Sequence, residues 1–205
     1  MEVLESRLEL AQEYIAKGMG YDKYRAMVDA YAEIGKSTGP EQSEARIEYT
    51  KLNQRRMKRW DKTFKISEDQ LNTLAQSNSK LTFLAITESW CGDAAASLPI
   101  INKIAEASPN ISLKIVLRDE SLDLMEAFLT NGTMSIPKLI MINEDADEVI
   151  GEWGPRPSIA TKMVQACKAE HGKLTEQFKE DLQVWYNKNK GENILSDILE
   201  LLPLE

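Results

Sequence analysis

Hydrophobic side chains in the first 62 residues recur at spacings of three and four, which is the periodicity of a helix with one apolar face. The clearest stripe lies near the start of the chain and consists of Leu4, Leu8, Ala11 and Ile15. Two glycines and a Ser-Thr-Gly-Pro loop divide the segment. We therefore expect three helices, over about 2–17, 21–34 and 40–61, and no strand.

From residue 66 onward, short apolar runs alternate with helical patterns. The apolar runs have the length of strands and lie at 81–87, 111–117, 138–142 and 148–153. Helices are expected over about 67–77, 92–107, 121–131 and 158–171, followed by two more over 173–189 and 192–202. A strand–helix–strand unit followed by a hairpin and a last helix predicts an α/β fold, with a central mixed sheet flanked by helices.

These patterns divide the chain into three parts. Residues 1–62 form an all-helical N-terminal extension, and residues 63–172 form the α/β domain. Residues 173–205 form a C-terminal helical tail that we expect to pack on the domain. A length of 205 residues suits one domain with such elaborations.

The composition is that of a soluble globular protein, with 42% hydrophobic and 28% charged residues. No apolar run approaches the roughly 20 residues that a membrane span needs, so we expect no membrane association. The N-terminus is acidic and lacks the basic start and apolar segment of a signal peptide. With only two cysteines, the sequence predicts a cytoplasmic location.

The charge is unevenly distributed along the chain. Residues 1–62 carry 12 Lys and Arg against 11 Asp and Glu, so the net charge of −8 arises from residues 63–205. Such an acidic domain is unsuited to nucleic acid, which requires cations to replace phosphate counterions. One basic cluster stands apart: Lys51, Arg55, Arg56, Lys58, Arg59 and Lys62. We interpret it as a solvated helix face or a face docked on the acidic domain, and expect no nucleic-acid partner.

Cys91 is the strongest candidate for chemistry, because it falls between an apolar strand and a helix. The N–H groups and the dipole of a helix N-terminus favour a thiolate, whereas the nearby Asp93 opposes it by like-charge repulsion. Trp90 is placed to form an apolar wall beside the sulfur, and Gly92 permits close approach of another chain. Without further context, a lone cysteine is more often an inert buried residue.

Three separate features of the sequence resemble the thioredoxin superfamily. Trp90-Cys91-Gly92-Asp93 is similar to the start of its active-site motif. Pro99 falls where the family has a proline in the active-site helix, and Ile136-Pro137 matches a pair whose proline is cis. The resemblance covers about residues 66–171 and implies a thioredoxin-like fold. It also implies that Ile136 and Pro137 lie against the Cys91 sulfur and present backbone groups to a bound substrate.

Two departures from the family pattern concern the second half of the dithiol reaction. Ala94 occupies the position of the resolving cysteine, and Ala85 that of a buried aspartate that handles protons for it. The remaining cysteine, Cys167, shares a helix face with Ile159 and Val164 and is expected to be a core thiol. In this fold the helix that carries Cys167 packs on the sheet and its later turns run away from the active-site end, so a bridge to Cys91, which needs Cα atoms within about 7 Å, is disfavoured.

Several charged residues near the thiol have two interpretations. Glu88 and Asp93 either tune the pKa of Cys91 or are exposed loop carboxylates. Arg118 is either a cation near the thiolate or the partner of a nearby carboxylate, and Arg156 is a weaker candidate for the same role. The turn at Trp153-Gly154 is expected to lie close to the cis-proline loop.

The only histidine, His171, is expected to end a helix. With one histidine and two distant cysteines, the sequence has no metal-ligand cluster, and no metal or cofactor is expected.

The function predicted from these features is that of a monothiol thiol–disulfide oxidoreductase. Cys91 would attack a mixed disulfide on a protein or a low-molecular-weight thiol, and an external thiol would resolve the product. One alternative is a non-catalytic thioredoxin-fold module that binds a partner protein. A further alternative is a redox sensor in which Cys91 forms a sulfenate.

Overall fold

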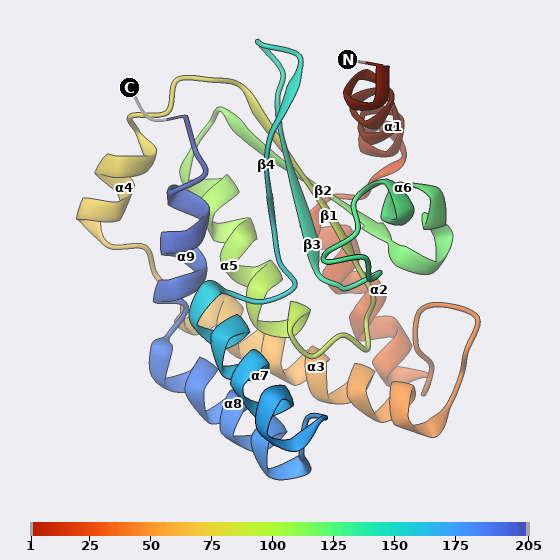
Figure 1. The fold of residues 1–205 in the computed structure, drawn as a ribbon. Helices are drawn as coiled ribbons and strands as arrows, with labels where there is room; N and C mark the ends of the chain where they lie inside the picture. The colour runs from red at the N-terminus through yellow and green to blue at the C-terminus, as the bar shows by residue number, and fades with distance from the viewer. Residues whose placement is uncertain (1, 204–205) are drawn as a thin grey trace.

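A mixed four-stranded sheet lies at the centre of the molecule (Figure 1). The structure is a computed structural model that describes residues 2–203, with side chains from Ser6 onward. The strands are β1 (Leu81–Thr87), β2 (Ile111–Leu117), β3 (Lys138–Asn143) and β4 (Glu148–Trp153), in the order β2-β1-β3-β4. β1 and β2 are parallel, while β3 is antiparallel to β1 and β4. The predicted α/β fold is confirmed.

The helices occur close to the positions that the sequence predicts. The extension contains α1 (Glu2–Lys17), α2 (Tyr21–Glu33) and α3 (Glu44–Thr63). The central part contains α4 (Glu68–Leu74), α5 (Ala94–Ala107), the 3-10 turn η1 (Arg118–Glu120), α6 (Leu122–Ala127) and α7 (Ser158–His171). The tail contains α8 (Glu176–Asn189) and α9 (Glu192–Leu199). Leu4, part of the predicted apolar stripe, lies outside the residues whose side chains are described.

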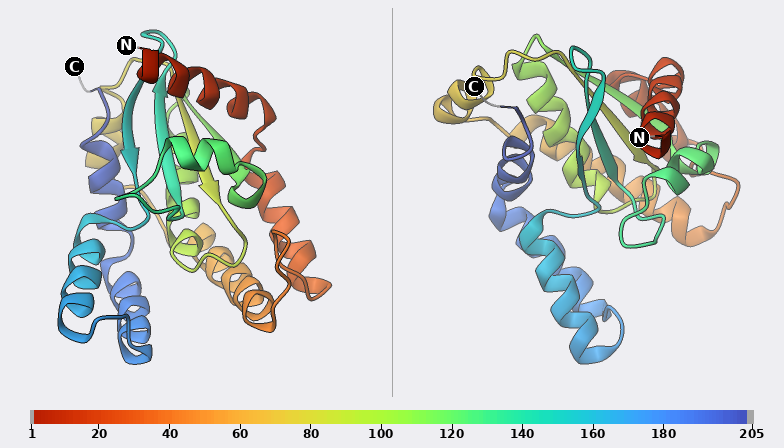
Figure 2. Two further views of the ribbon diagram at one scale, coloured as in Figure 1. Left: turned by 45° about the vertical axis from the view of Figure 1, so that its right-hand side comes forward. Right: turned by 45° about the horizontal axis from the view of Figure 1, so that its top comes forward.

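Helices cover both faces of the sheet. α1 and α6 pack on one face, while α5 and α9 lie side by side on the other (Figures 1 and 2). Every residue of β1 and β3 is consequently buried, as expected for strands covered on two sides. Phe83, Leu84 and Ile86 have no exposed surface and form the centre of the core.

The helical hairpin of α7 and α8 projects beyond the end of the sheet (Figure 2). We had expected α7 to pack on the sheet, and this expectation is wrong. Its place on that face is taken by α9 and the residues after it, where Leu201 lies against Gly151 of β4. Ile194 and Ile198 of α9 are fully buried, because this short helix closes the core beside α5.

The N-terminal extension packs directly on the α/β core. Between α1 and α2, Met19 exchanges two backbone hydrogen bonds with Ile115 of β2, at distances of 2.9 and 2.8 Å. α3 packs along α5, and its Met57 and Trp60 are buried there. The extension therefore covers both the edge of the sheet and the helix that follows Cys91.

Several predicted helix ends differ from the structure by two to four residues; among them, α4 ends at Leu74, α8 begins at Glu176 and α9 ends at Leu199. α3 begins at Glu44 and not at Pro40, since the side-chain amide of Gln42 donates to the Ser37 and Gly39 carbonyls and holds this segment as a loop. α6 ends at Ala127, before a tight turn closed by hydrogen bonds between Thr130 and Thr133. α5 begins at Ala94, two residues later than expected.

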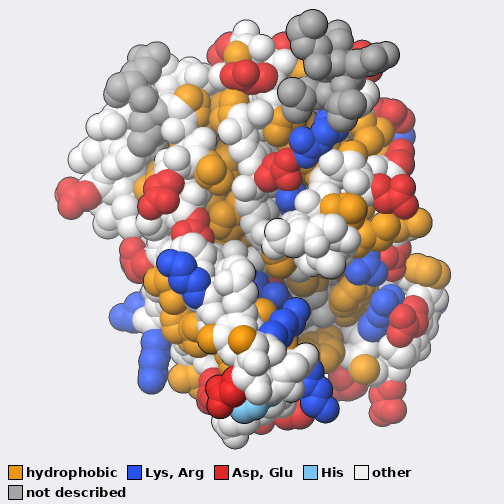
Figure 3. All heavy atoms as spheres, in the orientation of Figure 1, with side chains coloured by type: hydrophobic (Ala, Val, Ile, Leu, Met, Phe, Trp, Pro, Cys, Tyr) orange, Lys and Arg blue, Asp and Glu red, His pale blue; other side chains and the backbone are white. Residues whose placement is uncertain are grey.

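On the face shown in Figure 3, basic and acidic side chains are interspersed, and the described residues of this face form no continuous basic patch. Within residues 2–203, none of the helices combines the length and apolar character needed to cross a membrane.

Candidate thiol site at Cys91

Cys91 lies in the turn between β1 and α5, close to the loop that precedes β3. Its side chain is 7% exposed, and its Sγ donates a hydrogen bond of 3.3 Å to the carbonyl oxygen of Ile136. The peptide bond between Ile136 and Pro137 is cis. β1 and β3 are antiparallel neighbours with Ile86 opposite Lys138, so the end of β1 meets the start of β3. The sheet therefore brings together two segments that lie 45 residues apart.

The turn after β4 completes this part of the site. Gly154 has a φ of +109°, and a Cβ at this position would lie 2.2 Å from the carbonyl oxygen of Pro137. Only glycine allows the turn to approach the cis-proline loop this closely. The expected proximity of the Trp153-Gly154 turn and the cis-proline loop is confirmed.

Burial is the main influence on the Cys91 thiol and raises its pKa from 9.0 to about 12. The negative charge of Asp93 raises the pKa further. The backbone N–H groups of Ala94 and Asp93 and the cation of Arg156 act in the opposite direction. The helix N-terminus thus favours the thiolate as predicted, but burial outweighs it, and the resting thiol is protonated at neutral pH.

Asp93 is held in a buried polar network rather than in an exposed loop. Its Oδ2 forms a 2.6 Å ion pair with Arg156 Nη2, and its Oδ1 accepts a 3.1 Å hydrogen bond from the Tyr186 hydroxyl. Burial raises the pKa of Asp93, while Arg156 lowers it. Arg156, considered the weaker of two candidate cations from the sequence, is the one that acts on the Cys91 thiol.

Glu88 is also buried, with no exposed surface. One of its carboxylate oxygens accepts a hydrogen bond from the Thr38 hydroxyl, and the other accepts from the Asp119 N–H at 2.9 Å. Burial raises the pKa of Glu88, and these two donors lower it. Both oxygens hold neighbouring loops, so the interpretation of Glu88 as an exposed loop carboxylate is wrong.

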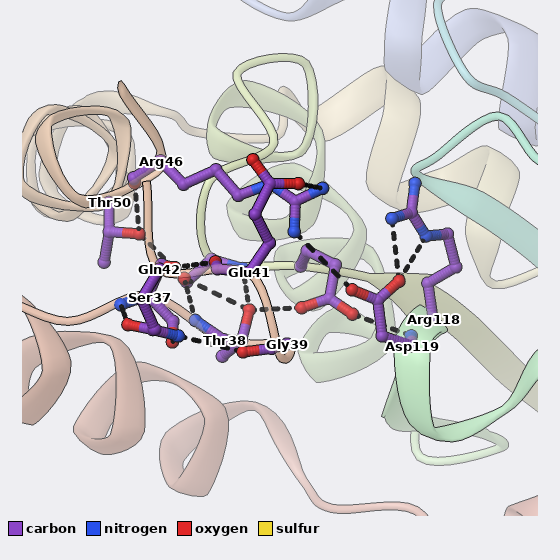
Figure 4. Close-up of polar contacts among 11 residues, drawn as sticks. Ser37, Thr38, Gly39, Glu41, Gln42, Arg46, Thr50, Arg118 and Asp119 are labelled. Carbon is purple, nitrogen blue, oxygen red and sulfur yellow. Dashed lines mark hydrogen bonds and ion pairs between the residues drawn. The ribbon is translucent and has the colours of Figure 1, made fainter. Parts of the chain in front are cut away.

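Arg118 pairs with a carboxylate, which was one of its two predicted roles. Its guanidinium lies 2.7 Å from Asp119 Oδ1, and Arg46 approaches the other oxygen of Asp119 at 3.7 Å (Figure 4). The guanidinium groups of Arg46 and Arg118 also lie 4.3 and 4.9 Å from the centre of the Trp90 ring. These cation–π contacts fix the tryptophan that borders the thiol turn.

A set of buried hydrogen bonds joins the extension to the thiol turn, and sequence reasoning missed it. Two hydrogen bonds join Thr38 and Ser89. The Thr38 N–H donates to the Ser89 hydroxyl at 3.0 Å, and the Ser89 N–H donates to the Thr38 hydroxyl at 2.8 Å. From α3, Thr50 Oγ1 lies 2.8 Å from Ser89 Oγ, and Asn53 donates to the Ser89 carbonyl at 3.0 Å (Figure 4 shows Thr38 and Thr50). The only sequence signal is that Thr50 and Asn53 share the helix face of the buried Met57.

A cavity of about 740 Å³ opens beside Cys91. One wall is α3, with Tyr49, Leu52 and Arg56, and the facing wall is the start of α8 with the loop before it. The thiol turn, Ile136 and Arg156 form the rest of the lining. Neighbouring helices therefore enclose the space next to the sulfur.

Cys167 is not among the residues that line this cavity. Both cysteines are free thiols, and Cys167 is buried on α7, where its Sγ lies 3.7 Å from the Lys173 carbonyl oxygen. His171 is the last residue of the same helix, as predicted. Among residues 2–203, no group of three His, Cys, Asp or Glu side chains is arranged to hold a metal ion.

Comparison with known proteins assigns the family. A family model described as Thioredoxin matches residues 39–170, which is more than half of the chain. The chain belongs to this thioredoxin family. The match begins within the helical extension, so it includes α3 together with the sheet and the Cys91 turn.

Two solved structures share the fold of this thioredoxin family member. A protein of unknown function from Pseudomonas aeruginosa superposes with a TM-score of 0.53 at 16% identity, over 89% of this chain and 96% of that one. An HIV epitope scaffold gives a TM-score of 0.55 at 16% identity, over 89% and 97%. A search of curated proteins finds no match. At this identity the likeness concerns the fold alone.

Ala94 and Ala85 are both buried. Ala94 is the first residue of α5 and is 1% exposed, while Ala85 lies within β1 with no exposed surface. Each contributes a methyl group to the core. The site therefore has one sulfur, and its nearest carboxylate network is that of Asp93.

Proposed function

We propose that this protein carries out thiol–disulfide exchange through Cys91 as a monothiol oxidoreductase. The observation that carries the proposal is the position of Sγ, which lies 3.3 Å from the Ile136 carbonyl of the cis-proline loop and lines a cavity of about 740 Å³. A cavity of this size is typical of sites for small molecules. Backbone N–H groups of Asp93 and Ala94 are placed to donate hydrogen bonds to the sulfur and stabilise its negative charge.

The reaction has two exchange steps. In the first, the Cys91 sulfur bonds to one sulfur of a disulfide, and the other sulfur leaves as a thiol that takes the proton given up by Cys91. In the second, an external thiol attacks the mixed disulfide, displaces Cys91 and returns it to the protonated form. The external thiol supplies the reducing electrons, because position 94 offers no second sulfur.

The test is adduct formation on the intact protein. At pH 9, incubation with excess 2-hydroxyethyl disulfide should add one mercaptoethanol unit, and addition of a free thiol should remove it. Mass spectrometry should find the adduct on Cys91 in the wild-type protein and in a Cys167→Ser variant, and should find none in Cys91→Ser. An adduct that persists in Cys91→Ser, or a native protein that forms none, contradicts the proposal.

A second candidate function is a non-catalytic thioredoxin-fold module that binds a partner protein. The burial of Cys91 and its raised pKa favour this alternative, because a protonated thiol is a poor nucleophile. Such a module would bind its partner equally well after the substitution Cys91→Ser, whereas the monothiol enzyme would lose all turnover.

A further inference from the structure

Arg56 stands out among the arginines because it is half-buried and has no carboxylate partner. Six arginines in residues 6–203 are half-buried, and the other five form ion pairs: Arg7, Arg25, Arg46, Arg118 and Arg156. Within the part of the chain whose side chains are described, Arg56 makes only a 3.4 Å contact with the side-chain oxygen of Asn53. Burial lowers its pKa, and the field of Asp93, itself paired with Arg156, raises it. An unpaired guanidinium with this degree of burial is costly unless it receives an anion.

The guanidinium of Arg56 lies next to the reactive turn. Its Nη1 is 3.7 Å from the point that a Cβ on Gly92 would occupy, and both Arg56 and Cys91 line the same cavity. An anionic group on a molecule whose sulfur reaches Cys91 therefore falls within the range of Arg56. Because Arg56 belongs to α3, the helical extension supplies this part of the cavity.

The rest of the cavity lining is partly apolar and partly charged, and its facing wall includes Glu176 and Glu180. Leu52, Leu174 and Leu182 contribute apolar lining, and α8 faces α3 across the opening. Lys179 of that facing wall is paired with Glu176 at 2.6 Å, so it offers less attraction to an anion than Arg56 does. A planar guanidinium matches the two oxygens of a carboxylate and can bind them with two parallel hydrogen bonds.

We propose that Arg56 binds a carboxylate of a low-molecular-weight disulfide whose sulfur exchanges with Cys91. This inference rests on the proposed function and names the class of its substrate. The exchange step is the one described above: an S–S bond forms to Cys91, the S–S bond of the ligand breaks, and the departing half leaves as a thiol with the Cys91 proton. Arg56 takes no proton and forms no covalent bond; it positions the half that carries the carboxylate.

The test compares three small disulfides that differ mainly in charge. These are anionic 3,3′-dithiodipropionate, neutral 2-hydroxyethyl disulfide and cationic cystamine, each reacted at pH 9 with protein carrying Cys167→Ser. The ratio of the anionic to the neutral rate constant should be about ten and should fall to about one in Arg56→Gln. Arg55→Gln, a change at the adjacent exposed arginine that does not line the cavity, should keep the ratio of the parent protein.

A binding measurement separates this inference from the proposed function. Calorimetry on Cys91→Ser should detect dithiodipropionate and should show at least tenfold weaker binding when Arg56→Gln is added. If dithiodipropionate binds in an Arg56-dependent way but does not exchange with Cys91 in the protein that retains this cysteine, the anion site is supported and the oxidoreductase function is overturned. Exchange with equal anionic and neutral rates, or a ratio unchanged by Arg56→Gln, would overturn the role of Arg56 and leave the exchange reaction standing.

Discussion

At the scale of single residues, the pKa of the Cys91 thiol depends on opposing effects of its surroundings. Burial and Asp93 keep the proton on sulfur, while two backbone N–H groups and Arg156 favour its release. Arg156 forms a 2.6 Å ion pair with Asp93, so that carboxylate partly neutralises its charge. The Asp93–Arg156 pair therefore sets how much positive charge the sulfur experiences.

The first prediction concerns the pH dependence of Cys91. Because the pKa of the thiol is raised to about 12, its alkylation by iodoacetamide should accelerate about tenfold per pH unit from pH 8 to pH 10 without levelling. Asp93→Asn removes the like charge and frees Arg156, so it should lower the pKa and raise the rate at pH 8. The rates are measured by mass spectrometry in a Cys167→Ser background. A plateau below pH 9 in the parent protein would contradict the prediction.

The second prediction concerns Gly154. Gly154→Ala forces a methyl group into the Pro137 carbonyl at a φ of +109°, and should cost at least about 2 kcal/mol of the free energy of unfolding. Gly20→Ala is a suitable control, because a Cβ at Gly20 meets no atom within 4 Å. Urea unfolding followed by circular dichroism gives both values. Equal effects of the two substitutions would show that the close approach is unimportant.

At the scale of secondary-structure elements, the thiol turn is supported from outside the sheet. The turn between β1 and α5 obtains its hydrogen bonds from the loop after α2 and from one face of α3. Ser89 is the common partner, and it is only 2% exposed. Displacement of α3 would therefore alter the turn that carries Cys91.

The third prediction tests this support through Asn53. Asn53→Leu removes the donor to the Ser89 carbonyl and leaves that carbonyl buried without it, which should cost about 1–3 kcal/mol. It should also increase the alkylation rate of Cys91, because a looser turn exposes the sulfur. Lys58→Leu, at an exposed position of the same helix, should change neither quantity appreciably. If both variants behave alike, α3 does not support the turn.

The sequence predicts these elements to different extents. The four strands are evident because runs such as Leu81–Thr87 are mostly apolar, and the resemblance of the segments at Cys91 and Pro137 to the thioredoxin family indicates the candidate site. The hydrogen bond between Thr38 and Glu88 gives no signal in the local sequence. Each is a polar residue that is buried only because the fold brings it against a partner 50 positions away. The displacement of α7 from the sheet was missed because an amphipathic helix pattern does not specify which surface it covers.

At the scale of the whole molecule, the extension and the tail enclose the end of the domain that carries Cys91. α3 belongs to the first part of the chain and α8 to the last, and the cavity beside Cys91 lies between them. α9 then returns to the sheet and closes the core. The access of ligands to Cys91 is therefore governed by helices at both ends of the chain.

The fourth prediction is that the tail and the central domain unfold together. Ile198 of α9 has no exposed surface, so Ile198→Ala should lower the free energy of unfolding by about 2–5 kcal/mol. Val184→Ala, at a position 48% exposed on α8, should change it by less than about 0.5 kcal/mol. Far-ultraviolet circular dichroism and tryptophan fluorescence should give coincident transitions. Separate transitions would mean that the tail is an independent unit.

The pairing of Met19 with Ile115 has a consequence for self-association. A bare edge strand offers unpaired N–H and C=O groups to any extended chain, and is a common starting point for aggregation. β2 is such an edge, but its residue Ile115 already has both backbone groups engaged by the link between α1 and α2. An incoming strand would have to break these two bonds and push the extension aside. The helical extension therefore also hinders the addition of another strand at the β2 edge of the sheet.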